Sequence, residues 1–298
     1  MCGIVGLFLK DPGLEPELGG MLTDMLITMT DRGPDSAGIA IYSGAGEGRA
    51  KITVQSSRPA RDFQNLDRDL HDAIGMPVLM LHKDSHAVLE VPLDQLQAAR
   101  SALGHLRPQV KVMSAGESIE IFKEVGLPRD VAARFGLAGM KGTHGIGHTR
   151  MATESAVTTM GAHPFSTGDD QCLVHNGSLS NHNSVRRDLR RAGMTFETDN
   201  DTEVAAAFIS HKLQTGDSLS HAMEATLTDL DGFFTFVVGT RNGFGVVRDP
   251  IACKPAVMAE TDRYVAFGSE YRALVNLPGI DTARVWEPEP ATVYFWER

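Results

Sequence analysis

Cysteine is scarce in this chain of 298 residues. Cys2, Cys172 and Cys253 lie far apart and form no Cys-x-x-Cys pair, which argues against a disulfide framework, a zinc cage or a redox dithiol. We therefore expect a reducing, cytoplasmic location and no metal site or other cofactor held by this chain.

Positive charge is also in short supply. Lysine and arginine number 28 against 38 aspartates and glutamates, a formal net charge of −10, whereas an electrostatic binder of nucleic acid needs the opposite balance. The longest apolar stretches, such as residues 233–238, fall far short of the roughly 20 residues that span a bilayer. No basic residue precedes the apolar stretch at residues 4–9, as one would in a signal peptide. We expect neither a nucleic-acid partner nor a membrane partner.

The chain has ample material for a core, since 42% of its residues are hydrophobic. The pattern predicts a strand over residues 2–9, a helix that ends near residue 31, and a strand over residues 36–42. Four apolar residues share one face of that helix: Leu18, Leu22, Met25 and Met29. A later helix is expected around residues 204–213, followed by a strand pair within residues 233–247.

Residues 50–140 differ from the flanking segments in their pattern of polar and apolar residues. They offer a polar helix around Leu66 and Leu70, an apolar strand at residues 77–81 and a second helix near Leu96. We interpret this stretch as an insertion that forms its own α/β lobe.

Cys2 could be a nucleophile that carries its own base. Removal of Met1 would leave a thiol and a free α-amine on one residue, and an α-amine with a pKa of about 7.7 to 8.0 is well suited to take the thiol proton. This is the N-terminal version of the pairing between nucleophile and base. The alternative is a small buried cysteine on a strand.

Two motifs contain an arginine. Residues 32–38 read Arg-Gly-Pro-Asp-Ser-Ala-Gly and could by themselves be a turn. Residues 145–153 read Gly-Ile-Gly-His-Thr-Arg-Met-Ala-Thr and place Arg150 among strand residues, where a lone guanidinium would be costly without an anion. A substrate carboxylate would supply that anion, and an internal salt bridge is the alternative.

The tripeptide His175-Asn176-Gly177 follows an apolar strand. An Asn amide and a Gly N–H are the donors that an oxyanion hole for acyl transfer needs, although an ordinary Asn-Gly hairpin has the same sequence. The acidic stretch at residues 196–203 then opens the next helix, where its Asp and Thr residues could simply be caps.

Taken in this order, the motifs resemble those of the class II, or N-terminal nucleophile (Ntn), glutamine amidotransferases. Five match: Met-Cys-Gly-Ile-Val-Gly at the start, the heptapeptide at 32–38, Gly-His-Thr-Arg with its Ala-Thr tail, His-Asn-Gly, and the Asp-Thr-Glu of residues 201–203. The resemblance covers residues 1–45 and 141–275. It implies an α+β fold, the αββα four-layer sandwich of Ntn hydrolases, with the inserted lobe added.

The resemblance also implies catalytic roles. Cys2 would attack the side-chain amide of L-glutamine, its α-amine would be the base, and Asn176 with the Gly177 N–H would form the oxyanion hole. A γ-glutamyl thioester and ammonia would follow, and then hydrolysis to glutamate.

Substrate-binding roles follow in the same way. Arg150 would bind the α-carboxylate of glutamine and Asp201 its α-ammonium, with Asp199 the less favoured candidate. Arg32 would steady the loop near the nucleophile, and Thr153 would add a contact to the substrate. Two departures alter the expected shape of the pocket: Met151 stands where several members have Trp, and Glu154 stands where some have His.

We expect a single amidotransferase domain over residues 1–298, with its core at 2–45 and 141–298. Three segments, at residues 148–155, 248–255 and 267–271, are similar in sequence to one kind of amidotransferase. This is the stand-alone, glutamate-synthase-like component of methylamine–glutamate N-methyltransferase (N-methylglutamate synthase). That similarity implies partner subunits that resemble the other glutamate synthase domains, hold the FMN and the iron–sulfur cluster, and receive the ammonia.

Two other hypotheses remain open from the sequence. The chain could be a scaffold that binds a γ-glutamyl amide with slow or no turnover, or an Ntn hydrolase of another γ-glutamyl amide. In each case we expect the inserted lobe to lie beside the mouth of the active site, where partners could dock.

Overall fold

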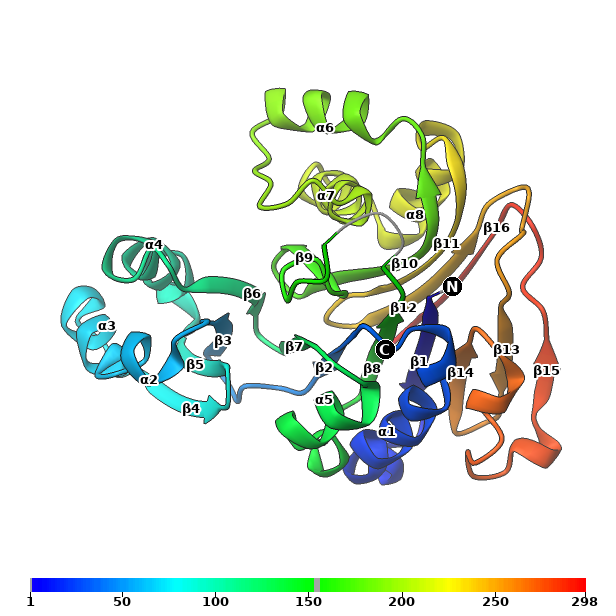
Figure 1. The fold of residues 1–298 in the computed structure, drawn as a ribbon, viewed down its shortest axis with the longest axis horizontal. Helices are drawn as coiled ribbons and strands as arrows, with labels where there is room; N and C mark the ends of the chain where they lie inside the picture. The colour runs from blue at the N-terminus through cyan, green and yellow to red at the C-terminus, as the bar shows by residue number, and fades with distance from the viewer. Residues whose placement is uncertain (1, 153–155) are drawn as a thin grey trace.

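The computed structural model describes residues 2–152 and 156–298. Two antiparallel sheets pack face to face and helices cover the outer surface of each, so the αββα four-layer sandwich is confirmed (Figure 1). A smaller lobe with its own sheet projects from one end of the long axis of the molecule (Figure 1). In the described part of the chain, no helix combines the length and the apolar character that a bilayer crossing requires.

The first sheet has seven strands in the order β15-β13-β14-β1-β8-β2-β7. Its strands are β1 (Gly3–Leu9), β2 (Ser36–Tyr42), β7 (Ile119–Val125), β8 (His144–Arg150), β13 (Val257–Glu260), β14 (Tyr264–Gly268) and β15 (Arg284–Trp286). Helices α1 (Leu18–Thr28) and α5 (Pro128–Phe135) contribute to the core on its outer face.

Strand β1 shows why an unbroken apolar run forms here. Alternate side chains of a strand point to opposite faces, and both faces of this sheet are covered. Val5 and Leu7 pack in the core that includes α1, whereas Ile4 and Phe8 pack in the core between the two sheets.

The second sheet has five strands in the order β16-β12-β11-β10-β9. Its strands are β9 (Phe165–Gly168), β10 (Gln171–Leu179), β11 (Gly232–Gly239), β12 (Gly243–Arg248) and β16 (Thr292–Glu297). The outer helices are α6 (His182–Arg191), α7 (Asp201–Gln214) and α8 (Leu219–Asp229), and side chains from all three join the core on that face.

The lobe is built on a four-stranded sheet in the order β4-β5-β3-β6. Its elements are β3 (Arg49–Gln55), α2 (Pro59–Asp62), α3 (Leu66–Ile74), β4 (Leu79–Lys83), β5 (His86–Pro92), α4 (Leu96–Leu106) and β6 (Lys111–Gly116). Short 3-10 helices complete the chain: η1 (Pro12–Glu17), η2 (Thr30–Arg32), η3 (Leu93–Gln95), η4 (Leu137–Gly139), η5 (Tyr271–Ala273) and η6 (Ile280–Thr282).

Part of the stretch that we assigned to the lobe belongs to the sandwich instead. Residues 119–140 contain β7, which pairs with β2 at the edge of the seven-stranded sheet, and α5, which packs over that sheet. The reason is that β7 has apolar residues for both covered faces: Ile121 packs between the sheets and Phe122 packs on the outer side.

The position of the lobe also differs from our expectation. The lobe follows β2 after Tyr42 and returns to β7 at Ile119, and these two residues are paired with each other. Arg150 pairs with Ser36, which is the first residue of β2 and lies at the other end of that strand. The lobe is therefore connected at the end of the sheet opposite to Arg150.

Three histidines that are fully inaccessible to solvent make the fold sensitive to acid. Burial lowers the pKa of His86, His144 and His148 to about 3 in each case. Between pH 6.5 and pH 3 the unfolded chain binds more protons than the folded chain, so stability falls as the pH falls. Between pH 7.5 and pH 5.5 we expect a loss on the order of 1 kcal/mol for each of the three.

Urea unfolding at these two pH values checks this prediction. A His144→Asn variant should lose less stability between pH 7.5 and pH 5.5 than the wild type does, whereas His221→Asn, which changes an exposed residue, should show the wild-type difference. Equal wild-type stability at both pH values would contradict the prediction.

Candidate active site

Cys2 lies immediately before β1, and it is partly exposed. Its carbonyl oxygen accepts two hydrogen bonds, from Arg32 Nε at 2.9 Å and from Asn176 Nδ2 at 3.2 Å. Gly3 pairs with Thr149 in the antiparallel β1–β8 register, so Arg150 is the next residue of β8 toward Cys2. The structure thus brings Cys2, Arg32, Asn176 and Arg150 to one end of the sandwich.

Asn176 and Gly177 lie near the end of β10, and the Asn176 side chain is almost fully buried. Gly177 has a φ of +150°, and a Cβ at this position would lie 2.0 Å from the Phe233 carbonyl oxygen. Only glycine fits this position without displacing the neighbouring strand. Since the Asn176 amide nitrogen carries two hydrogens, one can bind the Cys2 carbonyl while the other is available to a ligand.

Arg150 is the last residue of β8 and is only 6% exposed. Its backbone oxygen accepts a hydrogen bond from the Asp35 N–H at 3.1 Å, and the Asp35 carboxylate accepts one from the Ala152 N–H at 2.8 Å. The side-chain Nη1 of Arg150 contacts the Ala156 carbonyl oxygen at 3.5 Å. Asp35 of the heptapeptide therefore supports the backbone at Arg150 and at Ala152.

Asp201 is the first residue of α7, directly after the Asn200 cap. Its Oδ2 accepts a hydrogen bond from the Leu179 N–H at 2.9 Å, and its Oδ1 lies 3.8 Å from His175 Nδ1. Burial acts to raise the pKa of Asp201, but the hydrogen bond and charge of His175 and the Leu179 N–H lower it to about 2. Asp201 is therefore an anion at neutral pH, and its contacts are with β10 rather than with Cys2.

The other two predicted binding residues have different outcomes. The Asp199 side chain is fully exposed and lies 3.6 Å from Arg186. Thr153 lies outside the described residues, as does Glu154. Met151 is exposed beside Arg150.

Sequence reasoning missed a histidine network behind these residues. Thr202 Oγ1 lies 2.8 Å from His163 Nε2 and 3.1 Å from His175 Nδ1, and His148 Nε2 lies 3.1 Å from the His175 carbonyl oxygen. Burial lowers the pKa of His148 to about 3 and holds that of His163 well below its usual range. Both rings are neutral at pH 7, and they bind the neighbours of Asp201 and Asn176 in the chain, Thr202 and the His175 carbonyl.

Sequence reasoning also missed Ser269 and Glu270, which follow β14. Glu270 Oε1 accepts a hydrogen bond from Arg32 Nη1 at 2.8 Å. Residues 267–271 were noted only as one of the segments similar to the glutamate-synthase-like component, and that similarity predicted no role for either residue.

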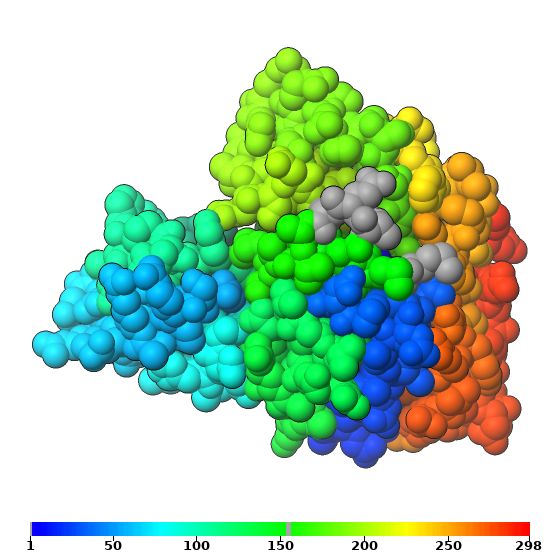
Figure 2. Space-filling model, viewed as in Figure 1, coloured from blue at the N-terminus to red at the C-terminus, as the bar shows by residue number. Residues whose placement is uncertain are grey.

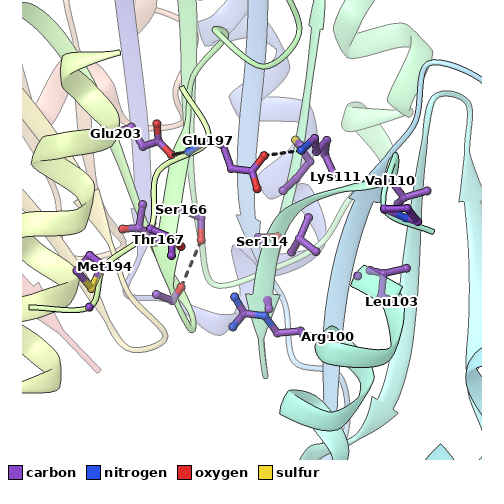
Figure 3. Close-up of a pocket in the computed structure, with 18 of the residues that line it drawn as sticks. Arg100, Leu103, Val110, Lys111, Ser114, Ser166, Thr167, Met194, Glu197 and Glu203 are labelled. Atoms are coloured by element: carbon purple, nitrogen blue, oxygen red, sulfur yellow. Dashed lines mark hydrogen bonds and ion pairs between the residues drawn. The ribbon is translucent and has the colours of Figure 1, made fainter. Parts of the chain in front are cut away.

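A cavity of about 540 Å³ lies elsewhere, between the lobe and the sandwich. Figure 3 shows Lys111 of β6 paired with Glu197, and the carboxylate of Glu203 accepts hydrogen bonds from residues 197 and 198. The surface has a notch where the lobe meets the helical layer (Figure 2). Neither Cys2 nor Arg150 lines this cavity, so it is separate from the candidate active site.

The part of the chain that the structure describes contains no group of three or more His, Cys, Asp or Glu residues arranged to hold a metal ion. The side-chain donors that bind Cys2 are the Asn176 amide and the Arg32 guanidinium, and the guanidinium of Arg150 comes from the adjacent end of β8. Such donors bind carboxylates and oxyanions.

Comparisons with known proteins show the family of the chain. A family model described as a glutamine amidotransferase domain matches residues 148–276. The chain is 68% identical over 297 residues to the glutamine amidotransferase-like protein GlxB of Rhizobium meliloti (strain 1021), a match that covers 100% of this chain and 98% of that protein. It is 32% identical over 177 residues to the glutamine–fructose-6-phosphate aminotransferase of Shewanella oneidensis, covering 54% of this chain and 29% of that enzyme.

A solved structure shows the same fold. The glutamine phosphoribosylpyrophosphate amidotransferase from B. subtilis, complexed with ADP and GMP, has a TM-score of 0.63 at 20% identity, and the match covers 99% of this chain and 47% of that one. The fold is that of the Ntn amidotransferases. The chain belongs to the class II glutamine amidotransferases.

Proposed function

We propose that this chain is a glutaminase, with Cys2 as the nucleophile after removal of Met1. The observation that carries the proposal is the shared contact at Cys2, whose carbonyl oxygen is bound by both Arg32 and Asn176. This contact supports the proposal because the residue that carries the thiol is bound by an amide donor and lies opposite Arg150 in the β1–β8 register.

The reaction begins when the α-amine of Cys2 takes the thiol proton and the sulfur attacks the side-chain amide carbon of glutamine. The amide oxygen becomes an oxyanion that the second Asn176 N–H and the Gly177 N–H stabilise. Collapse of this intermediate breaks the C–N bond, and the amine returns its proton to the leaving ammonia. Water then attacks the thioester, which releases glutamate and restores the thiol.

Glutamine binds through its two α-substituents in this proposal. Arg150 pairs with the α-carboxylate and Asp201 with the α-ammonium, so a free amino acid is preferred to a peptide-bonded residue. Because the pKa of Asp201 is about 2, its charge is available over the whole range in which the Cys2 amine can act as a base.

Turnover of amides by the purified chain tests this proposal. L-glutamine should yield equal amounts of glutamate and ammonia, and L-asparagine, one methylene shorter, should yield little aspartate. A competition between glutamine and γ-glutamylmethylamide decides whether another γ-glutamyl amide is the preferred substrate. If the chain binds these amides without releasing ammonia or methylamine, the scaffold hypothesis is favoured and the glutaminase proposal fails.

We also propose that the ammonia passes to separate partner subunits, and that the chain is the amidotransferase component of a methylamine–glutamate N-methyltransferase (N-methylglutamate synthase). Support comes from the match over nearly the full length of a glutamine amidotransferase-like relative, and from the sequences of residues 148–155 and 267–271. The partners would resemble glutamate synthase domains and would carry the FMN and the iron–sulfur cluster.

Purification of the tagged chain with its native partners tests the second proposal. The complex should show flavin absorbance and should form N-methylglutamate from methylamine and glutamate. Failure to form that product, with intact glutaminase activity, would leave the chain a glutaminase of another complex.

A further inference from the structure

The segment that follows β14 is hydrogen-bonded to the start of β1. The Ser269 N–H donates to the Ile4 carbonyl oxygen at 2.9 Å, and the Ile4 N–H donates to Ser269 Oγ at 2.9 Å. Ser269 is 2% exposed, so these bonds are shielded from water. Together they fix the backbone two residues after Cys2.

Glu270 acts on Cys2 through Arg32. Glu270 Oε1 binds Arg32 Nη1 at 2.8 Å, and Arg32 Nε binds the Cys2 carbonyl oxygen at 2.9 Å. The guanidinium is planar and rigid, so a carboxylate on one side sets the direction of the N–H on the other side. Arg32 is 8% exposed and Glu270 is 34% exposed, so the pair lies at the edge of the buried site.

A second arginine, Arg272, binds the other carboxylate oxygen of Glu270. Arg272 Nε lies 2.6 Å from Glu270 Oε2, and Arg272 Nη1 lies 3.3 Å from Asp31 Oδ2. The Arg32 hydrogen bond, with further contributions from the charges of Arg32 and Arg272, lowers the pKa of Glu270 below its usual range. Glu270 is therefore an anion held between two cations.

These contacts matter because of what an N-terminal nucleophile lacks. Once Met1 is removed, no peptide bond precedes Cys2, and nothing on its amino side restrains the residue through the chain. The orientation of the thiol and the amine then depends on contacts to the Cys2 carbonyl and on the anchoring of the strand that follows.

We propose that Ser269 and Glu270 are positioning residues that hold Cys2 in its reactive orientation, Ser269 through Ile4 and Glu270 through Arg32. The inference rests on the glutaminase function proposed above. The contacts of Ser269 and Glu270 run to β1 and Arg32, so each residue affects the attack on the amide rather than the binding of glutamine.

A Glu270→Gln variant tests the inference, since it keeps the shape of the side chain and removes its charge. We expect kcat to fall about 10- to 100-fold, the size of effect that a small misplacement of a reacting group produces. KM for glutamine should stay within about twofold, because KM reports the α-carboxylate and α-ammonium contacts in this mechanism. The rate at which iodoacetamide labels Cys2 should fall with kcat.

The matched control is Glu260→Gln, which breaks the Lys10–Glu260 ion pair at 2.6 Å on the same sheet. This variant should keep the wild-type kcat. A Glu270→Gln variant with wild-type kcat and labelling rate, or with an increase in KM alone, would overturn the inference.

A double-mutant cycle separates positioning from general destabilisation. Arg32→Lys keeps the charge but cannot bridge two acceptors as the guanidinium does. If Glu270 acts through Arg32, adding Glu270→Gln to Arg32→Lys should lower kcat no further. Independent losses that multiply in the double variant would contradict the inference. If Glu270→Gln alone folds poorly, kcat of the double variant is compared with that of Arg32→Lys, and a lower kcat in the double variant would contradict the inference.

The outcomes also distinguish this inference from the proposed function. A wild type that releases no ammonia but is labelled rapidly at Cys2 contradicts the glutaminase function, and labelling of the variants still tests the positioning role of Glu270. A wild type that shows neither turnover nor labelling contradicts both.

Discussion

Replacing Cys2 by Ala should abolish the release of ammonia from glutamine. The substitution removes the attacking sulfur and keeps the α-amine, so the expected loss in kcat is at least about 1,000-fold, because no other group in the site can form the thioester. Coupled detection of glutamate at saturating glutamine measures this loss directly.

The chain offers a matched control for this variant. Cys253 is an exposed free cysteine, and a Cys253→Ala variant should retain the wild-type rate. Residual wild-type activity in Cys2→Ala would show that the nucleophile lies elsewhere, and loss of activity in both variants would indicate a general effect of cysteine removal.

Neutralising Asp201 should produce the second large effect, on substrate binding. An Asp201→Asn variant leaves the α-ammonium of glutamine without its partner in a half-buried site, at a cost of about 2 to 4 kcal/mol, or about 30- to 1,000-fold in kcat/KM. The loss should appear mainly as an increase in KM, because the ammonium does not change during the reaction.

Two comparisons make this prediction specific. Asp199→Asn changes a fully exposed carboxylate two residues away and should leave kcat/KM unchanged. Glutaramate, which lacks the α-amino group, should be turned over equally by the wild type and by Asp201→Asn. Equal losses with glutamine and with glutaramate would mean that Asp201 supports the fold rather than the α-ammonium.

The pattern of the sequence predicted individual strands well where both of their faces are covered, whereas the sandwich itself was implied by the family resemblance. In β1 every position is buried, so a continuous apolar run marks it plainly. The first helix was equally legible, since Leu18, Leu22 and Met25 recur at helical spacing and are all buried in α1.

The boundary of the lobe was harder to predict because β7 joins the sandwich through long-range pairing. Its partner β2 lies more than 70 residues earlier in the chain, and no local pattern reveals which sheet an apolar strand will enter. The end of the sheet from which the lobe projects depends on the same pairing.

Functional residues could be predicted from the sequence only where a recognisable motif contains them. Motifs placed Cys2, Asn176 and Arg150 together because each belongs to a short, recognisable segment. Glu270 was not predictable as a support for Arg32, since 238 positions separate the two residues and only the pairing of β14 with β1 brings them together. The direction of pKa shifts, such as that of Asp201, likewise depends on neighbours such as His175 that the fold supplies.

Mass spectrometry of the purified chain after reaction with a glutamine analogue that carries a diazoketone in place of the amide tests the central claim most directly. The account predicts an intact mass without Met1, one equivalent of label, a modified peptide that begins at the labelled Cys2, and protection by excess glutamine. A chain that keeps Met1, or a label on Cys172, Cys253 or any residue other than Cys2, would contradict it.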